Sequence, residues 1–237
     1  MKILVVGGIH GNEPLGTKLV SRFKADPQKN VGAILANERA VAKNKRFINT
    51  DLNRSFPGNI KSLNYEEKRA AELIDICRKY DLVLDFHNTH CPDNDCTFVG
   101  ENALPSVYSV ASWFNLSRVI VANYDCINKY AGNCLSVEVS LTSKRMDAES
   151  WYILISELAK KNELPPASNL KRYKFTYRIT LEDRDRFNLG RLNLKAFKAI
   201  PKELAISLGV DSPAYPIFIA DQYTPYNYGG LVNRIIE

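Results

Sequence analysis

The sequence predicts an α/β protein with a mixed, mostly parallel sheet that carries helices on both faces, followed by a small β-rich C-terminal domain. Three observations predict this fold class. The expected strands are nearly continuous apolar runs, helical stripes alternate with them, and polar side chains gather where the strands end. Continuous apolar strands are typical of a sheet that is buried on both faces, and alternation with helices is typical of parallel pairing.

The first part of the chain alternates strands and helices. The stretch Ile3–Glu13 opens with an apolar strand that stops at two glycines, and Pro14 then suits the first turn of a helix. The elements expected after this strand are a helix from Pro14 to about Lys24, a strand over Val31–Ala36, a helix over Tyr65–Tyr80, a strand over Leu82–Phe86, a helix over Ala103–Phe114, strands over Arg118–Ala122 and Leu135–Val139, and a helix over Asp147–Lys161, with Asp147 as its N-cap.

Two segments interrupt this alternation. The polar segment Asn37–Gly58 is too long and too charged for an economical connection, and irregular segments of this kind more often carry function than packing. Glu163–Asn169 is rich in proline and small polar residues, so it predicts a linker between a catalytic domain (residues 1–162) and a small β-rich domain (residues 169–237) that contributes to the site. The elements expected beyond it are strands over Tyr173–Thr180, Leu192–Ile200 and Tyr215–Ala220 and a short helix over Lys202–Leu208.

Composition limits the classes of function. The chain has 237 residues, of which 45% are hydrophobic and 24% are charged, and its net charge is +6. The basic residues are scattered, which argues against nucleic-acid binding, and no apolar run approaches the roughly 18 residues of a membrane span. Five cysteines make an odd count and no secretory leader is evident, so we expect a reduced, cytoplasmic protein.

His10, Glu13 and His87 form the candidate metal site. All three fall at expected strand ends, where sites form in sheets of this class. Two imidazoles and one carboxylate leave a fourth position for water, which is the composition of a catalytic zinc site rather than a closed structural one. For each residue alone, a structural hydrogen bond remains an alternative.

A second zinc arrangement competes for the same histidine. His87, His90, Cys91 and Cys96 could together form a closed His/Cys knot, although four intervening residues between the cysteines are at the upper end of the usual ligand spacing. Two unpaired thiols in a loop are the simpler interpretation.

Four further residues could supply chemistry. Glu138 lies in an apolar strand, where it is either a structural salt-bridge partner or a general base that takes a proton from water. Arg46 could hold a developing oxyanion, and Asn53 with Arg54 could bind a carboxylate, although loop arginines are usually solvated.

The motifs GIHGNE, RFINTDLNR, DFHNT and SVEV, in this order, resemble the aspartoacylase and succinylglutamate desuccinylase family of zinc carboxypeptidase-like proteins, and they are closer to the aspartoacylase branch. The resemblance implies one Zn²⁺ per chain on His10, Glu13 and His87. It also implies Glu138 as the catalytic glutamate and Arg46 as the residue that polarises the scissile carbonyl. The substrate-binding residues that it implies or leaves as candidates are Asn53, Arg54, Asn88, Tyr124, Asn128, Lys129, Tyr223 and Tyr226.

The sequence departs from the family pattern at the position of the arginine that holds the side-chain carboxylate of N-acetylaspartate. Asn128 falls there, with Lys129 adjacent, and Ser140-Leu141 replaces the usual Gly-Pro. The predicted function is a zinc-dependent deacylase of a small anionic N-acyl-L-amino acid, with N-acetylaspartate as the first substrate to test. A carboxypeptidase-like peptidase and a non-catalytic metal-containing binding protein are the alternatives. No nucleic acid or membrane partner is expected, and a homodimer is compatible with the sequence.

Overall fold

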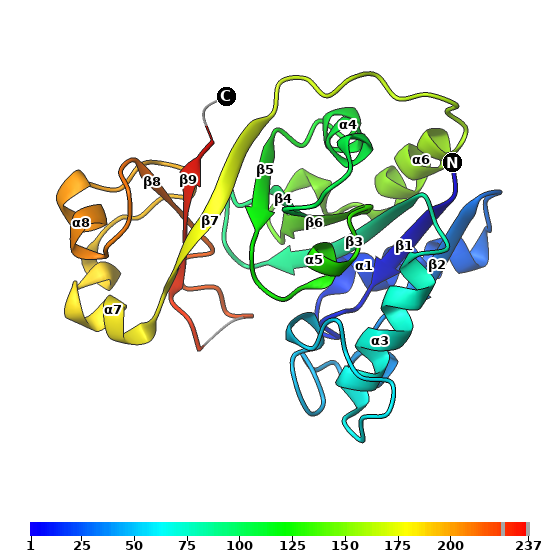
Figure 1. Cartoon of the computed structure of the whole chain (residues 1–237), viewed down its shortest axis with the longest axis horizontal. Coiled ribbons are helices and arrows are strands. Elements are labelled where there is room, and N and C mark those ends of the chain that lie inside the picture. Colours follow the sequence, from blue (N-terminus) through cyan, green and yellow to red (C-terminus); the bar gives the residue numbers. More distant parts are fainter. Residues whose placement is uncertain (224–225, 236–237) are drawn as a thin grey trace.

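The computed structural model describes residues 1–223 and 226–235, and within them one sheet of nine strands runs through the molecule (Figure 1). The strand order is β2-β1-β3-β6-β4-β5-β7-β9-β8. The strands are β1 (Ile3–Gly7), β2 (Val31–Leu35), β3 (Leu82–Thr89), β4 (Cys96–Gly100), β5 (Arg118–Ala122), β6 (Cys134–Ser140), β7 (Lys171–Ile179), β8 (Ala214–Ile217) and β9 (Gly229–Arg234). The α-helices are α1 (Pro14–Ala25), α2 (Glu38–Ala42), α3 (Tyr65–Cys77), α4 (Pro105–Trp113), α5 (Ile127–Tyr130), α6 (Ala148–Ala159), α7 (Leu181–Arg186) and α8 (Lys202–Ser207).

Helices cover both faces of the sheet, as the alternation of side chains along β1 shows. Ile3 and Val5 pack into a cluster with side chains of α1, α4 and α6, whereas Leu4 and Val6 pack into a second cluster with side chains of α3. Successive residues of a strand point to opposite faces, so each face of β1 has its own apolar layer. The predicted fold class, a mixed sheet with helices on both faces, is therefore confirmed.

Most of the strand pairs are parallel. β2, β1, β3 and β6 run parallel to one another, β4 is antiparallel to β6, and β5 is parallel to both β4 and β7. The C-terminal strands β9 and β8 add antiparallel pairs beyond β7, so the same sheet passes from the first part of the chain into the second. The boundary between a catalytic and a C-terminal domain stays a prediction.

Several elements differ from those expected. The strand expected over Leu192–Ile200 is wrong, because Phe197 has a left-handed backbone (φ 55°) that breaks the extended run. The short strand β4 and the helices α2, α5 and α7 were not expected, since each has too few residues to show a clear period. The strand β9 was not expected either. Asp147 caps α6 as expected, because its carboxylate accepts hydrogen bonds from the backbone N–H groups of Glu149 and Ser150.

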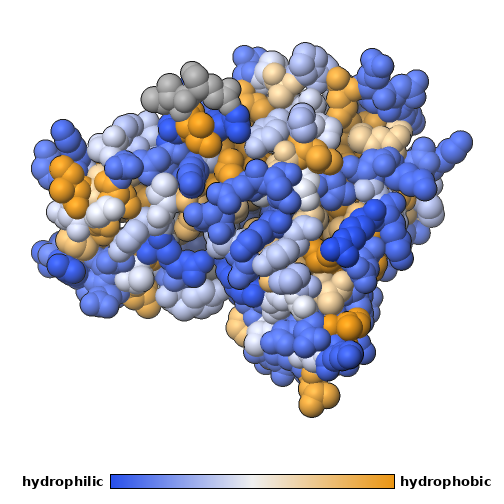
Figure 2. All heavy atoms as spheres, viewed as in Figure 1, coloured by the Kyte–Doolittle hydropathy of each residue, from blue (hydrophilic) through white to orange (hydrophobic). Residues whose placement is uncertain are grey.

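The face of the molecule in Figure 2 is mostly hydrophilic, with hydrophobic side chains scattered over it. Among the described residues, we find no helix with the length and apolar character that crossing a membrane requires.

Candidate active site

The turn between β1 and α1 carries the first two candidate ligands. His10 follows the end of β1, and Glu13 holds the N-cap position of α1 without capping it. Gly11 lets this turn pack closely, since a Cβ atom there would lie only 2.1 Å from the carbonyl carbon of Ala40. The Glu13 carboxylate makes no capping hydrogen bond to its own helix and instead contacts His10 and His87.

His87 reaches the same point from β3. Its Nδ1 lies 2.9 Å from Oε2 of Glu13, and Nδ1 of His10 lies 2.7 Å from Oε1 of the same carboxylate. One ligand atom from each of the three residues lies within 4.8 Å of the other two, and all three side chains are buried. This is the one His/Cys/Asp/Glu cluster with such spacing in the part of the chain that the structure describes.

Two outer carboxylates orient the histidines. Nε2 of His10 lies 3.1 Å from Asp51, and Nε2 of His87 lies 2.8 Å from Asp85. Carboxylate partners of this kind are typical of metal-binding histidines, because they fix the ring and raise the basicity of the nitrogen that faces the ion. Sequence reasoning missed both aspartates, although Asp85 interrupts an otherwise apolar strand and Asp51 lies inside RFINTDLNR.

The charges of this cluster fit a divalent cation. Burial alone would raise the pKa of Glu13, but His10 and His87 bring it well below its ordinary value. Burial alone would lower the pKa of His87, but Asp85 and Glu13 raise it well above its ordinary value. Without a metal, a proton on the buried His87 ring thus balances the buried carboxylates of Glu13 and Asp85. Two neutral imidazoles and a carboxylate are donors that Zn²⁺ accepts.

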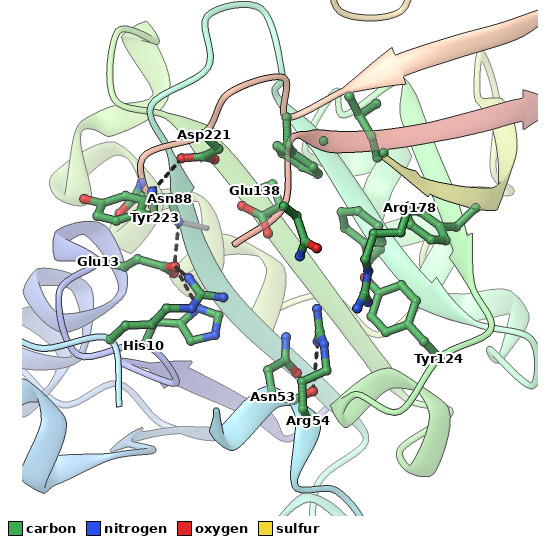
Figure 3. A pocket seen from close by; sticks show the side chains of 18 residues that line it. His10, Glu13, Asn53, Arg54, Asn88, Tyr124, Glu138, Arg178, Asp221 and Tyr223 are labelled. Atoms are coloured by element: carbon green, nitrogen blue, oxygen red, sulfur yellow. Dashed lines mark hydrogen bonds and ion pairs between the residues drawn. The ribbon is translucent and has the colours of Figure 1, made fainter. Parts of the chain in front are cut away.

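Glu138 lies beside this cluster on β6, directly opposite His87 in the β3–β6 pair. Burial raises its pKa to about 8, the positive charge of His87 opposes that rise, and the negative charge of Glu13 adds to it. The Glu138 carboxylate makes no hydrogen bond or ion pair with any described residue, so no partner supports a structural salt bridge. Its carboxylate faces the pocket (Figure 3).

Arg46 reaches the cluster from the polar segment. Its guanidinium lies 3.5 Å from Oε1 of Glu13 and holds Asp51 through Nε and Nη2, at 3.3 and 3.2 Å. Asp51 therefore joins Arg46 to His10. Because the side chain of Arg46 is largely buried, its charge is little screened by solvent.

Most of the predicted site residues line one pocket. Its empty volume is about 750 Å³, which includes the open mouth. Asn53 and Arg54 enter it from a 3₁₀ turn (Leu52–Arg54), and the guanidinium carbon of Arg54 lies 4.7 Å from the centre of the Tyr124 ring. The lining residues are His10, Glu13, Arg46, Asn53, Arg54, Asn88, Phe98, Tyr124, Glu138, Phe175, Arg178, Ile217, Phe218, Asp221, Tyr223, Asn227, Gly229 and Gly230.

The structure corrects the positions that were expected to read the substrate side chain. The Asn128 amide is buried and donates to the carbonyls of Phe98 and Cys134, and its oxygen accepts from Ser136, so Asn128 is turned away from the pocket. Lys129 lies on the surface and pairs with Asp125 at 2.8 Å. Counting back from Glu138 could not show this, because α5 directs both side chains elsewhere.

Asn88 and the two candidate tyrosines have different places. Asn88 lines the pocket, but its side chain accepts from Leu15 and donates to Val139, while its backbone N–H donates to Glu13. It therefore positions the Glu13 carboxylate. Tyr223 lines the pocket, whereas the exposed Tyr226 is outside the lining and donates to Asp51 at 3.3 Å.

The competing zinc knot does not form among the described residues. The His90 ring packs on Tyr223, with the ring centres 4.1 Å apart, and the Cys91 thiol donates to the carbonyl of Ile219. Cys96 pairs with Glu138 across the β4–β6 ladder. The two thiols are free and buried, which is the simpler alternative from the sequence.

Sequence reasoning also missed the contribution of the C-terminal segment. Asp221 is buried in the pocket wall, where it accepts hydrogen bonds from the Thr89 hydroxyl and from the backbone N–H of Tyr223. Arg178 of β7 enters the pocket from the side opposite the metal cluster (Figure 3). Nothing in the local sequence pattern marks either residue.

Comparison with known proteins gives a consistent family. A family model described as the succinylglutamate desuccinylase/aspartoacylase catalytic domain matches residues 1–136. A probable aspartoacylase of Trichodesmium erythraeum is 33% identical over 147 residues, which are 56% of this chain and 50% of that protein. An N-acyl-aromatic-L-amino acid amidohydrolase (carboxylate-forming) of Rattus norvegicus is 33% identical over 40% of this chain and 36% of its own length. The chain thus spans about half, or less, of the length of these relatives.

Solved structures share the fold. Succinylglutamate desuccinylase from Chromobacterium violaceum superposes with a TM-score of 0.74 at 16% identity, over 100% of this chain and 85% of that one. Murine aminoacylase 3 superposes with a TM-score of 0.71 at 19% identity, over 99% of this chain and 95% of that one. At these identities the likeness concerns the fold alone.

Proposed function

Because the chain belongs to the succinylglutamate desuccinylase/aspartoacylase family, we propose that it is a zinc-dependent amidohydrolase that cleaves an N-acyl-L-amino acid into a carboxylate and a free amino acid. The observation that carries this proposal is the cluster of His10, Glu13 and His87 beside an unpaired Glu138. The names of the relatives, aspartoacylase and N-acyl-aromatic-L-amino acid amidohydrolase, support the substrate class.

The three clustered residues would hold the metal. Zn²⁺, when bound, supplies a Lewis acid that stabilises negative charge on oxygen and lowers the pKa of water. Asp51 and Asp85 hold the two imidazoles so that their Nδ1 atoms face one point.

Glu138 would move the proton. Its carboxylate takes a proton from the attacking water as the water oxygen bonds to the amide carbon, and it then gives that proton to the leaving nitrogen as the C–N bond breaks. Glu138 is placed for this double role because its side chain lies in the pocket beside the metal cluster and makes no competing ion pair among the described residues.

Arg46 and the pair Asn53 and Arg54 would hold two different parts of the substrate. Arg46 lies next to Glu13 and is placed to stabilise the oxyanion of the tetrahedral intermediate. Asn53 and Arg54 face the pocket together and would bind the α-carboxylate, for which a planar guanidinium is well suited. Tyr223 would cover the site from the C-terminal part.

Substrate comparison on one enzyme preparation tests the proposal. The chain is freed of metal with a chelator, reloaded with zinc, and assayed for amino acid release from N-acetyl-L-aspartate, N-acetyl-L-phenylalanine and N-acetyl-L-alanine. We expect release only after zinc is restored. Faster hydrolysis of C-terminal dipeptides than of any acylated amino acid would instead assign a peptidase, and tight substrate binding without turnover would assign a binding protein.

A further inference from the structure

Arg178 has no assigned role in the proposed reaction and no partner to explain its position. Its guanidinium points into the pocket (Figure 3), yet it makes no hydrogen bond or ion pair with any residue that the structure describes. A cation that lines a substrate pocket without a counter-charge is free to bind an anion from solution.

A β-bulge aims Arg178 at the pocket. In the β7–β9 pair, Phe175 faces Val232 and Tyr177 faces Leu231, so one extra residue of β7 is inserted between these pairs. In a regular strand Phe175 and Arg178, three positions apart, would point to opposite faces of the sheet. The inserted residue reverses this relation, so both side chains line the pocket, and re-aiming a side chain at a site is a known use of bulges.

The opposite strand leaves space for a ligand at this position. Arg178 pairs with Gly230 of β9, which has no side chain to stand beside the guanidinium. A Cβ atom on Gly230 would lie 2.8 Å from the ring of Phe175. Gly230 therefore keeps this end of the pocket open between the ring of Phe175 and the guanidinium of Arg178.

Arg54 and Arg178 carry the positive charge of this end of the pocket, next to Tyr124 (Figure 3). Arg54, Tyr124 and Arg178 all line this part of the pocket. Burial raises the pKa of the Tyr124 hydroxyl above its ordinary value, and the positive charges of both arginines act against that rise. Neither arginine has an ion-pair partner among the described residues, and Glu13 and Asp221 lie on the other side of the pocket (Figure 3). The two guanidinium groups therefore give the Tyr124 side of the pocket an unpaired positive charge.

We propose that Arg178 is a specificity-determining residue that binds a second carboxylate of the substrate, while Asn53 and Arg54 bind the first. This inference rests on the proposed function for the first carboxylate. Asn128 cannot supply a positive charge here, because its amide is neutral and is turned away from the pocket. Arg178, which lies on β7, would supply that charge instead. The second carboxylate belongs either to an acidic amino-acid side chain or to a dicarboxylic acyl group such as succinyl.

Matched substrates with one and two carboxylates test this proposal on the zinc-loaded full chain. N-Acetyl-L-aspartate is compared with N-acetyl-L-asparagine, and N-succinyl-L-alanine with N-acetyl-L-alanine, on wild type and on Arg178→Gln. Arg178 is an exposed residue, and a hydrogen-bonded charge pair at such a position corresponds to about tenfold in affinity, or ~1.4 kcal/mol. We expect Arg178→Gln to raise KM about tenfold for the two-carboxylate member of one pair. We expect kcat, and the KM of the one-carboxylate member, to stay within twofold of wild type.

Two further variants separate charge from structure. Arg178→Lys keeps the charge and is expected to recover part of the selectivity. Lys174→Gln removes a positive charge from the same strand outside the pocket, and it is expected to leave both substrate pairs unchanged. The proposal would be overturned if KM rose equally for one- and two-carboxylate substrates in Arg178→Gln, or if it rose in neither pair. It would also be overturned if Lys174→Gln raised KM as much as Arg178→Gln does, or if Arg178→Gln weakened only the hydrolysis of N-acetyl-L-phenylalanine.

A binding measurement keeps the inference separate from the proposed reaction. The affinities are measured by calorimetric titration, which needs no turnover. N-Acetyl-L-aspartate, N-acetyl-L-asparagine, N-succinyl-L-alanine and N-acetyl-L-alanine are each titrated into Glu138→Gln and into the double variant Glu138→Gln/Arg178→Gln. Selective loss of affinity for a two-carboxylate ligand supports the role of Arg178 even if wild type hydrolyses no N-acyl amino acid. Equal affinities in the two proteins would contradict that role even if the enzyme is an active deacylase.

Discussion

Glu138 and His87 lie side by side on neighbouring parallel strands, at the same register position of the β3–β6 pair. One strand thus delivers a candidate metal ligand and the next a candidate base, and the ladder hydrogen bonds between the strands fix their separation. Sites on strands hold their groups more rigidly than sites on loops.

Glu138→Gln removes the proton acceptor and keeps the shape of the side chain. We expect kcat to fall 10²- to 10⁴-fold, the usual contribution of a positioned base, while zinc content stays at wild-type level. Steady-state kinetics and metal analysis of the same preparation check this. A variant with near wild-type kcat would remove Glu138 from the reaction.

Metal binding is expected to release protons and to strengthen as the pH rises. The pKa of His87 is raised above its ordinary value by Asp85 and Glu13, so at low pH the ring holds a proton that competes with the metal. That proton is lost as the pH passes upward through the raised pKa, and zinc affinity then levels off. Calorimetry in two buffers of different ionisation enthalpy measures the released protons, and a pH-independent affinity would argue against His87 as a ligand.

Asp51→Asn is expected to weaken zinc binding 10- to 100-fold, because the amide cannot supply the negative charge that orients His10 and holds Arg46. Asp75→Asn is the matched control, since Asp75 is exposed and, among the described residues, pairs with Arg78 on the surface and not with a site residue. Competition with a chromophoric chelator measures both affinities. Equal affinities for the two variants would mean that Asp51 has no part in the metal site.

Asp147→Ala removes the N-cap of α6 and is expected to lower the free energy of unfolding by about 1 kcal/mol. The helix packs against the core through Trp151 and Ile155, and neither these residues nor Asp147 lines the pocket, so kcat and KM should stay at wild-type values. Urea denaturation followed by circular dichroism gives the stability. Loss of activity in the folded variant would contradict this separation.

The metal cluster could be predicted from the sequence because its determinants are local. His10 and Glu13 are three positions apart in a turn that follows an apolar strand, and His87 closes another such strand. Parallel strands bring these ends to the same edge. The nearly continuous apolar runs also predicted most of the sheet and both of its helical layers.

The far end of the pocket could not be predicted because its determinants are not local. The direction of Arg178 depends on a bulge that exists only in the pairing of β7 with β9, fifty or more positions along the chain. Asn128 was placed by counted spacing, which takes no account of the turn that α5 introduces before β6. The strand expected over Leu192–Ile200 failed for a similar reason, since alternation alone does not reveal the left-handed residue Phe197.

Anomalous diffraction at the zinc edge, from crystals of the zinc-loaded protein, tests the central claim most directly. We predict one peak per chain, with Nδ1 of His10 and of His87 at about 2.0–2.1 Å and a Glu13 oxygen at about 2.0–2.2 Å. A peak at Cys91 and Cys96, or no peak near His10, Glu13 and His87, would contradict the account.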